Sequence, residues 1–157
     1  MPTLSPFIQR IAPFVGLVVA VLLAYANVYD NAFLFDDDLI ITHNDLLKDW
    51  GSFFTLFTTS TTAGVHIAGG FYRPIQILLY LLIHQFFGFS TIAFHGLNVA
   101  LHAANACLMF TLGRRLKFNP VASFCAALVW AVHPIHTEAV TYMSATADVL
   151  FGFFSLL

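Results

Sequence analysis

Residues 11–38 read IAPFVGLVVAVLLAYANVYDNAFLFDDD, and this stretch decides the fold class. Its first part, Ile11 to Tyr29, is about 19 residues long and carries no charged side chain. A helix of that length can cross the hydrocarbon core of a bilayer. The acidic cluster Phe35-Asp36-Asp37-Asp38 follows shortly afterwards, so we expect it at the membrane edge. Ala24-Tyr25-Ala26 resembles a signal-peptidase site, which leaves a cleaved signal peptide as the alternative to a first span.

The composition of the whole chain favours the membrane interpretation. Hydrophobic residues make up 59% of the 157 residues and charged residues 9%, against roughly 25% charged residues in soluble domains. We therefore predict an all-α integral membrane protein with an uncleaved first span. The six basic residues form no extended patch, which argues against a nucleic-acid partner. Cys107 and Cys125 both lie in apolar stretches and are expected to be small buried side chains.

The acidic cluster is the first candidate for a functional site. The chain has 8 acidic residues, and three of them are consecutive. Ionised groups next to hydrocarbon are costly, so their clustering at a bilayer edge is typical of a functional role. The alternative is a solvated loop that marks where a helix leaves the membrane.

The chain is predicted to contain about four transmembrane helices and one large external loop. The spans are expected at 11–29, 91–112, 118–132 and 138–157, and the loop covers 30–90. Within the loop, 74–89 is predicted as an amphipathic helix, because Gln76, Tyr80 and His84 give it one polar edge. Arg10 and the run Arg114-Arg115-Leu116-Lys117 are both expected on the cytoplasmic side. An even number of crossings must then separate them, which places 74–89 along the outer interface rather than across the membrane.

Two of the predicted spans carry polar stripes. His95, Asn98, His102 and Asn105 share one face of 91–112, and such a face must contact protein or a wet cavity. Hydrogen bonding between helices is the simpler interpretation for the two asparagines, whereas His95 lies near the outer end and could reach a site.

The last span, 138–157, is expected to carry Asp148 about three turns from its start. Thr141, Ser144 and Ala145 would share its face. This carboxylate is either paired with a further helix or functional.

A metal site is not predicted. His133, His136 and Glu138 have loosely metal-like spacing, and the acidic cluster could complete a divalent metal site, but Pro134 breaks the helical geometry that zinc hydrolases use. The sequence also contains no glycine-rich nucleotide loop and no pattern of a Ser-His-Asp hydrolase.

An ordered set of motifs resembles the N-terminal part of the transmembrane and tetratricopeptide-repeat O-mannosyltransferase family. This family belongs to the GT-C membrane glycosyltransferases, together with the protein O-mannosyltransferases. The resemblance covers residues 11 to 157. The motifs are Phe35-Asp36-Asp37, Asn44, Trp50, Tyr72-Arg73-Pro74, Phe94-His95-Gly96-Leu97-Asn98, His102, His133-Pro134-Ile135-His136-Thr137-Glu138-Ala139-Val140 and Asp148.

The resemblance implies a partial GT-C catalytic domain over 1–157 in a polytopic helix bundle. We expect an N-terminal fragment, since 138–157 ends in apolar residues and the chain contains no tetratricopeptide repeats. Family members pass a sugar, here mannose, from a polyprenyl-phosphate donor to a protein hydroxyl outside the cytoplasm. The expected partners are this lipid-linked donor, a protein acceptor and membrane lipids, with no further cofactor. The expected location is the inner membrane of a prokaryote or the endoplasmic reticulum of a eukaryote.

The resemblance also implies roles for individual residues. Asp36 aligns with the family's leading acid and is the expected general base, with Asp37 as its support, although the three consecutive carboxylates leave this order open. Arg73 is the candidate for the donor phosphate, because guanidinium matches phosphate geometry; a membrane anchor for the following helix is the alternative. The other predicted substrate-binding residues are Tyr72, His95, His133, His136, Glu138 and Asp148.

Two other classes of protein remain as alternatives, a non-catalytic polytopic membrane protein and a subunit of a lipid or solute transporter. A transporter would distribute ionisable residues along a path through the membrane. Here the polar motifs collect on one predicted side, which disfavours transport.

Overall fold

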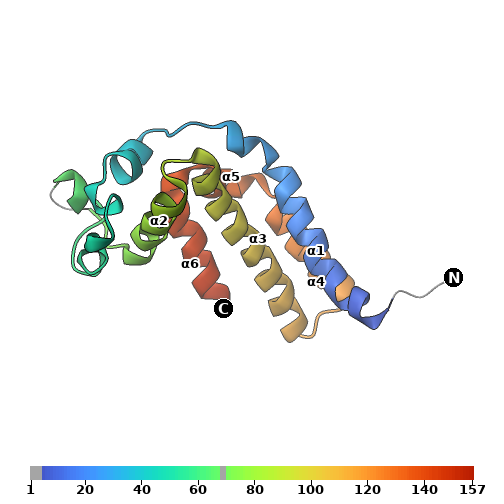
Figure 1. The fold of residues 1–157 in the computed structure, drawn as a ribbon. Helices are drawn as coiled ribbons and strands as arrows, with labels where there is room; N and C mark the ends of the chain where they lie inside the picture. The colour runs from blue at the N-terminus through green and yellow to red at the C-terminus, as the bar shows by residue number, and fades with distance from the viewer. Residues whose placement is uncertain (1–4, 68–69) are drawn as a thin grey trace.

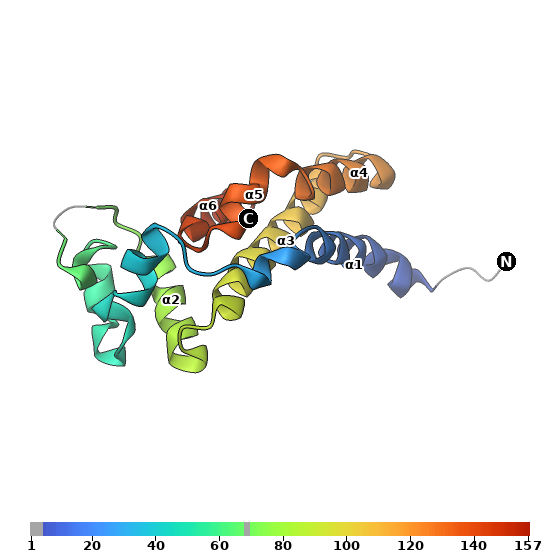
Figure 2. The ribbon, with the colours of Figure 1, turned by 90° about the horizontal axis from the view of Figure 1, so that it is seen from above.

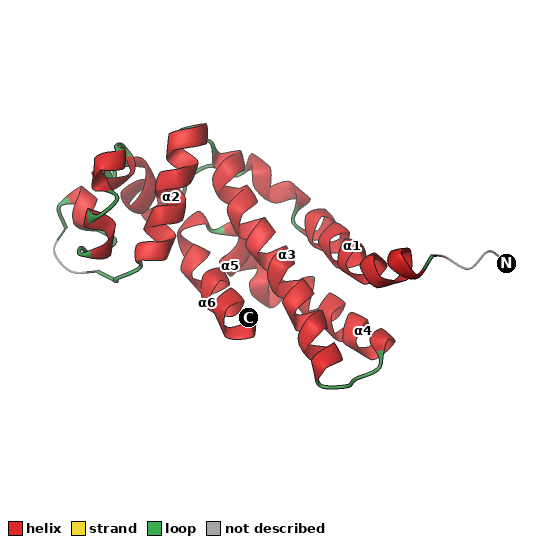
Figure 3. Ribbon diagram, turned by 60° about the horizontal axis from the view of Figure 1, so that its bottom comes forward, coloured by secondary structure: helices red, strands yellow, loops and turns green. Residues whose placement is uncertain are grey.

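The computed structural model describes residues 5–67 and 70–157. Within these ranges every regular element is a helix or a helical turn (Figure 3). The α-helices are α1 (Pro6–Ala24), α2 (Pro74–Phe87), α3 (Thr91–Arg115), α4 (Pro120–Ala131), α5 (Thr137–Thr141) and α6 (Thr146–Leu156).

Helix α3 is the centre of the molecule, with α1 and α4 on one side and α6 on the other (Figure 1). Small residues on α3 and α4, such as Ala106 and Ala127, are fully buried against Leu17 and Val21 of α1. Small side chains let helix backbones approach closely, which is how membrane helices gain packing energy. The four polar residues of the predicted α3 stripe are all buried, so this face contacts protein as expected.

Among the residues that the structure describes, two helices are long and apolar enough to cross a membrane, Phe7–Ala24 and Thr91–Arg115. A third candidate is the pair Pro134–Thr141 and Met143–Leu156, which is bent by 102°. Helices α2 and α4 are apolar but shorter. By length and composition the structure therefore supports two or three spans, where the sequence predicted four.

The single helix expected over 138–157 is interrupted between Thr141 and Thr146 by the 3-10 turn η8 (Met143–Ala145). Two side chains take the backbone groups that a continuous helix would use. The Ser144 N–H donates to Asp37, and the Tyr142 carbonyl accepts from Asn98. Asp148 consequently lies in the first turn of α6, not three turns into a helix.

The predicted external loop is folded into short helical turns that pack on α2. The turns are η1 (Ala26–Asp30), η2 (Asp38–Thr42, a π-helical turn), η3 (Asp45–Leu47), η4 (Trp50–Ser52), η5 (Thr55–Phe57) and η6 (Ala63–Val65). Ile41, Leu47 and Leu56 from these turns are buried against Ile77 and Leu81 of α2. Helix α2 runs crosswise to α3 (Figure 2).

The buried side chain of Asn44 organises this loop. Its amide nitrogen donates to the Ile40 and Thr61 carbonyls at 3.0 and 3.1 Å, and its Oδ1 accepts from the Leu46 N–H at 3.1 Å. Gly64 packs directly on it, because a Cβ at position 64 would lie 1.8 Å from the Asn44 Oδ1. The loop is thus held by specific contacts as well as by apolar packing.

Candidate functional site

The acidic cluster sits on a strained turn. Phe35 has a φ of 49°, in the left-handed region that non-glycine residues rarely adopt. Such strain costs on the order of 1–3 kcal/mol and is found mostly at functional sites. After this turn the two next carboxylates have different surroundings, since Asp36 is exposed and Asp37 is only 1% exposed.

Asp37 ties the loop to the break between α5 and α6. Its Oδ1 accepts hydrogen bonds from the Ser144 N–H at 2.8 Å and the Ser144 hydroxyl at 2.5 Å. Its Oδ2 accepts from the Leu34 N–H at 3.0 Å. Because its oxygens already accept three hydrogen bonds within the protein, this carboxylate is poorly placed to take a proton from a substrate.

Asp36 is fixed through its backbone and leaves its side chain accessible. Its N–H donates to the Tyr142 hydroxyl oxygen at 3.0 Å. Within the described part of the chain, no hydrogen bond or ion pair engages the Asp36 carboxylate.

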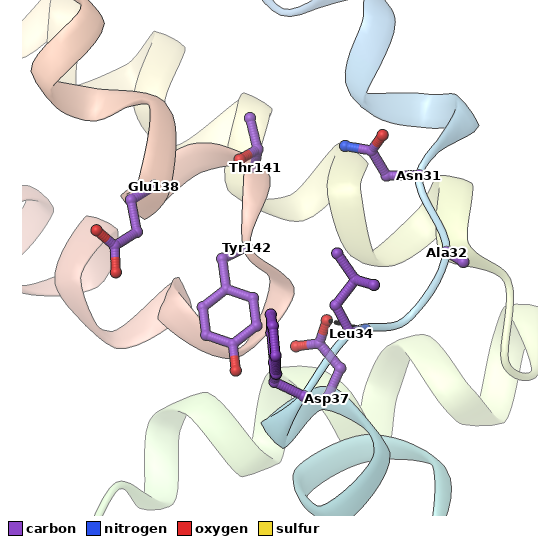
Figure 4. Close-up of a pocket in the computed structure, with 8 residues that line it drawn as sticks. Asn31, Ala32, Leu34, Asp37, Glu138, Thr141 and Tyr142 are labelled. Carbon is purple, nitrogen blue, oxygen red and sulfur yellow. Dashed lines mark hydrogen bonds between the residues drawn. The ribbon is translucent and has the colours of Figure 1, made fainter.

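A pocket of about 260 Å³ opens beside the acidic cluster (Figure 4). Its ionisable side chains are Asp37, Tyr142 and Glu138 on α5, which faces the Asn31–Leu34 segment across the pocket. The full lining is Asn31, Ala32, Leu34, Phe35, Asp37, Glu138, Thr141 and Tyr142. Elements about 100 residues apart in the sequence therefore build one acidic concavity.

A network of buried polar side chains continues from this pocket into the molecule. The Gln76 amide donates to the Ser144 carbonyl at 2.9 Å and to the Tyr80 hydroxyl at 2.7 Å. The Tyr80 hydroxyl oxygen in turn lies 2.6 Å from the Met143 carbonyl oxygen. Burial raises the pKa of Tyr80 well above its usual value, so it acts as a neutral hydrogen-bonding group.

Helix α3 completes this network. The Thr146 hydroxyl lies 2.9 Å from the Tyr80 hydroxyl and 2.5 Å from the Asn98 Oδ1. The Asn98 amide donates to the Tyr142 carbonyl at 2.9 Å. We call the set Asp37, Gln76, Tyr80, Asn98, Ser144 and Thr146 the polar network. Because each member bonds to another element, the network fixes the loop, α2, α3 and α6 relative to one another.

A second pocket, of about 230 Å³, lies where α2 begins and meets α6. Arg73 and Tyr72 line it together with the apolar side chains of Leu150 and Phe154. Its other lining residues are Pro74, Ile75, Gln76 and Ala147. The Arg73 guanidinium lies 4.5 Å from the centre of the Phe71 ring, a cation–π contact. A cation beside an apolar groove is suited to an anionic group that carries a hydrocarbon chain.

Hydrogen bonds link residues of the first pocket to residues of the second. Gln76 lines the second pocket and bonds to Ser144, whose N–H and hydroxyl hold Asp37 in the first. Both charges also act on Tyr80, where Asp37 raises the pKa and Arg73 lowers it. Asp37 in the first pocket and Arg73 in the second are therefore linked through the polar network, to which Asp37 and Gln76 belong.

Four other predicted residues lie outside the polar lining of these pockets. His95 is buried behind the first pocket, with Nε2 3.3 Å from the Asn31 carbonyl oxygen. His133 caps the turn η7 (Pro134–His136) by accepting the Ile135 N–H. His136 packs on Trp130, and Asp148 is exposed on α6. Among the described residues no group of three His, Cys, Asp or Glu side chains could hold a metal ion.

The sequence indicated part of the polar network without identifying it as a site. Gln76 and Tyr80 formed the expected polar edge of α2, and Asn98 belonged to the α3 stripe. Thr146 was not anticipated, because a lone threonine in an apolar run carries no signal of its own.

Comparison with known proteins identifies similar sequences. The chain is 32% identical to the Protein O-mannosyl-transferase TMTC4 of Homo sapiens, over 98% of this chain and 22% of that protein. It is 38% identical to the Protein O-mannosyl-transferase tmtc2 of Xenopus laevis, over 87% of this chain and 17% of that protein. It is 26% identical to the Protein O-mannosyl-transferase F38B6.6 of Caenorhabditis elegans, over 94% of this chain and 22% of that protein.

The chain spans about a fifth of the length of the curated relatives it matches. No family model matches it, and no solved structure is significantly similar to it. These relatives nevertheless share the name protein O-mannosyl-transferase, and their similarity covers 87% to 98% of this chain. The chain therefore belongs to the TMTC family of protein O-mannosyl-transferases.

Proposed function

We propose that the protein transfers mannose from a polyprenyl-phosphate donor to a hydroxyl group of a protein acceptor on the extracytoplasmic side of a membrane. The names of the relatives, protein O-mannosyl-transferases, support mannose as the sugar and a protein as the acceptor. The observation that carries the proposal is that the exposed carboxylate of Asp36 adjoins Phe35 and Asp37 of the first pocket, while a cation lies beside an apolar groove in the second pocket.

Asp36 is the proposed general base. Its carboxylate takes the proton of the acceptor hydroxyl while the acceptor oxygen bonds to C1 of the sugar. The bond between C1 and the phosphate oxygen breaks, and the polyprenyl phosphate leaves with the electron pair. A base within hydrogen-bond reach is required for this step. The exposed Asp36 meets that requirement better than Asp37, whose oxygens already accept three hydrogen bonds.

Arg73 is the proposed partner of the donor phosphate. A guanidinium stabilises the charge that develops on a leaving phosphate. The groove formed by Leu150 and Phe154 beside it supports an isoprenoid chain as the donor's lipid. Asp37 then acts as a positioning residue, since it holds Ser144 and, through it, Gln76 of the Arg73 pocket.

The proposed membrane arrangement follows the charge pattern. Helices α1, α3, α4 and the bent α5–α6 pair are proposed to cross the bilayer, with the acidic loop and α2 outside the cytoplasm. Arg10 and Arg114 line one pocket at the other end of the bundle, which supports a common cytoplasmic side for both. The proposed compartment is the endoplasmic reticulum or a prokaryotic inner membrane.

Transfer by the full-length protein tests the proposed function. Membranes containing it are incubated with radiolabelled mannosyl phosphoryl dolichol and an acceptor protein, and label in β-eliminable glycans is counted. We expect transfer from this donor and none from nucleotide-linked mannose added to washed, dolichol-depleted membranes. Transfer from the nucleotide sugar alone, or from neither donor, would contradict the proposal.

A further inference from the structure

A third pocket lies at the end of the bundle opposite to the acidic loop. It has a volume of about 420 Å³ and is formed by α1, the end of α3 and the start of α4, which lie together at this end (Figure 1). Two arginines line it, Arg10 from α1 and Arg114 from α3. Phe14 and Phe110 also line it, with ring centres 5.2 Å apart in an edge-to-face contact. Its other lining residues are Gln9, Pro13, Thr111 and Pro120.

The charged side chains in the segments at this end are all basic. Four of the chain's six basic residues, Arg10, Arg114, Arg115 and Lys117, lie in or beside these segments, and none of its eight acidic residues lies within 1–29 or 110–123. Both pocket arginines are exposed, and within the described ranges neither has an acidic partner. Two guanidinium groups that line one cavity without a counter-ion are complementary to an anion.

The local backbone prepares Arg114 for such a ligand. Lys117 adopts a left-handed φ of 64°, which ends α3 and turns the chain toward α4. The Phe118 carbonyl then accepts a hydrogen bond from the Arg114 guanidinium and restricts its position. Asn119 caps α4, whose amino end adds its partial positive charge at the pocket residue Pro120.

The opposite face of α1 carries a separate, apolar surface. A shallow cavity of about 440 Å³ is lined by Phe7, Ile8, Ile11, Ala12, Val15 and Gly16. Phe7 is 71% and Val15 is 53% exposed. With 3.6 residues per turn, these residues lie on the side of α1 opposite to Arg10 and Phe14 of the basic pocket. This surface is therefore suited to the lipid chains around α1 and is not part of the basic pocket.

We propose that this pocket binds the phosphate head group of an anionic membrane phospholipid. Basic pockets between membrane helices on the cytoplasmic side are suited to anionic lipid head groups. The site is distinct from the Arg73 pocket, which belongs to different elements at the other end of the bundle. The proposed lipid binding does not depend on the proposed sugar transfer.

Native mass spectrometry of the delipidated full-length protein tests this proposal. Phosphatidylinositol is titrated against phosphatidylcholine, and the apparent Kd of each adduct is compared for the parent and for the double variant Arg10→Gln, Arg114→Gln. Each guanidinium lost from the pocket removes a charge-assisted contact to the phosphate, which is about a factor of ten in affinity. The double variant should therefore bind phosphatidylinositol about 100-fold more weakly and phosphatidylcholine as the parent does.

The control variant Arg115→Gln, Lys117→Gln removes the same charge at the same end but outside the pocket, and its affinity should change less than about three-fold. An equal loss in the control would show diffuse attraction and overturn the site. Equal binding of both lipids by the parent would overturn it as well, independently of any variant. Displacement of the lipid by millimolar inorganic phosphate would identify a soluble-phosphate site instead.

Discussion

At the residue scale, the neighbours Asp36 and Asp37 are assigned different tasks by their surroundings. The left-handed turn at Phe35 separates a buried carboxylate from an exposed one. Three consecutive aspartates cannot be distinguished by composition or spacing. What distinguishes them is Ser144, whose N–H and hydroxyl reach Asp37 across 107 positions of sequence. That partner could not be foreseen from the acidic cluster alone.

Asp37→Asn should destabilise the fold. The amide cannot accept from all three donors as a carboxylate does, and hydrogen bonds to a buried charged group contribute about 1.5–3 kcal/mol each. We expect a loss of roughly 2–4 kcal/mol, visible as a lower Tm of the purified full-length protein. The matched variant Asp38→Asn, which alters an exposed carboxylate, should leave the Tm within about 1 °C of the parent. An unchanged Tm for Asp37→Asn would mean that the bonds to Ser144 contribute little.

At the element scale, the external loop depends on one close contact. Gly64→Ala would place a Cβ 1.8 Å from the Asn44 Oδ1 and 2.8 Å from the Leu46 nitrogen. Overpacking of this kind costs typically about 1–3 kcal/mol. We expect faster limited proteolysis between Asp38 and Phe71. Gly96→Ala is the matched control, because its Cβ would meet nothing within 4 Å in α3, and its proteolysis should be as slow as the parent's or slower. Equal rates for the two variants would contradict the importance of this contact.

The long helices were the most predictable elements. The apolar runs at 11–29 and 91–112 correspond to α1 and α3, although α1 starts earlier, where Ser5 caps it, and ends earlier at Ala24. The break near Tyr142 was not predictable, since the sequence stays compatible with a helix through it. The break exists because Asp37 and Asn98 bond to backbone groups there. Tertiary contacts of this kind override local helix propensity.

At the scale of the whole molecule, the structure separates charge. Arg10 and Arg114 share a pocket at one end, and the acidic loop packs on α2 at the other.

Single-cysteine variants, made after Cys107 and Cys125 are replaced by alanine, test the orientation of the protein in sealed vesicles. Thr58→Cys should react with an impermeant maleimide from the extracytoplasmic side and Lys117→Cys from the cytoplasmic side. Labelling of both from one side would refute this topology.

The two pockets work as one site only if the polar network holds the loop, α2 and the break before α6 together. The most direct measurement of the central claim is mannosyl transfer by the full-length Asp36→Asn protein, compared with Asp38→Asn at equal expression. Loss of a general base typically lowers the rate by roughly 10²–10⁴. We expect that loss for Asp36→Asn, with an unchanged Tm and with Asp38→Asn near the parent rate. Transfer at the parent rate by Asp36→Asn would contradict it.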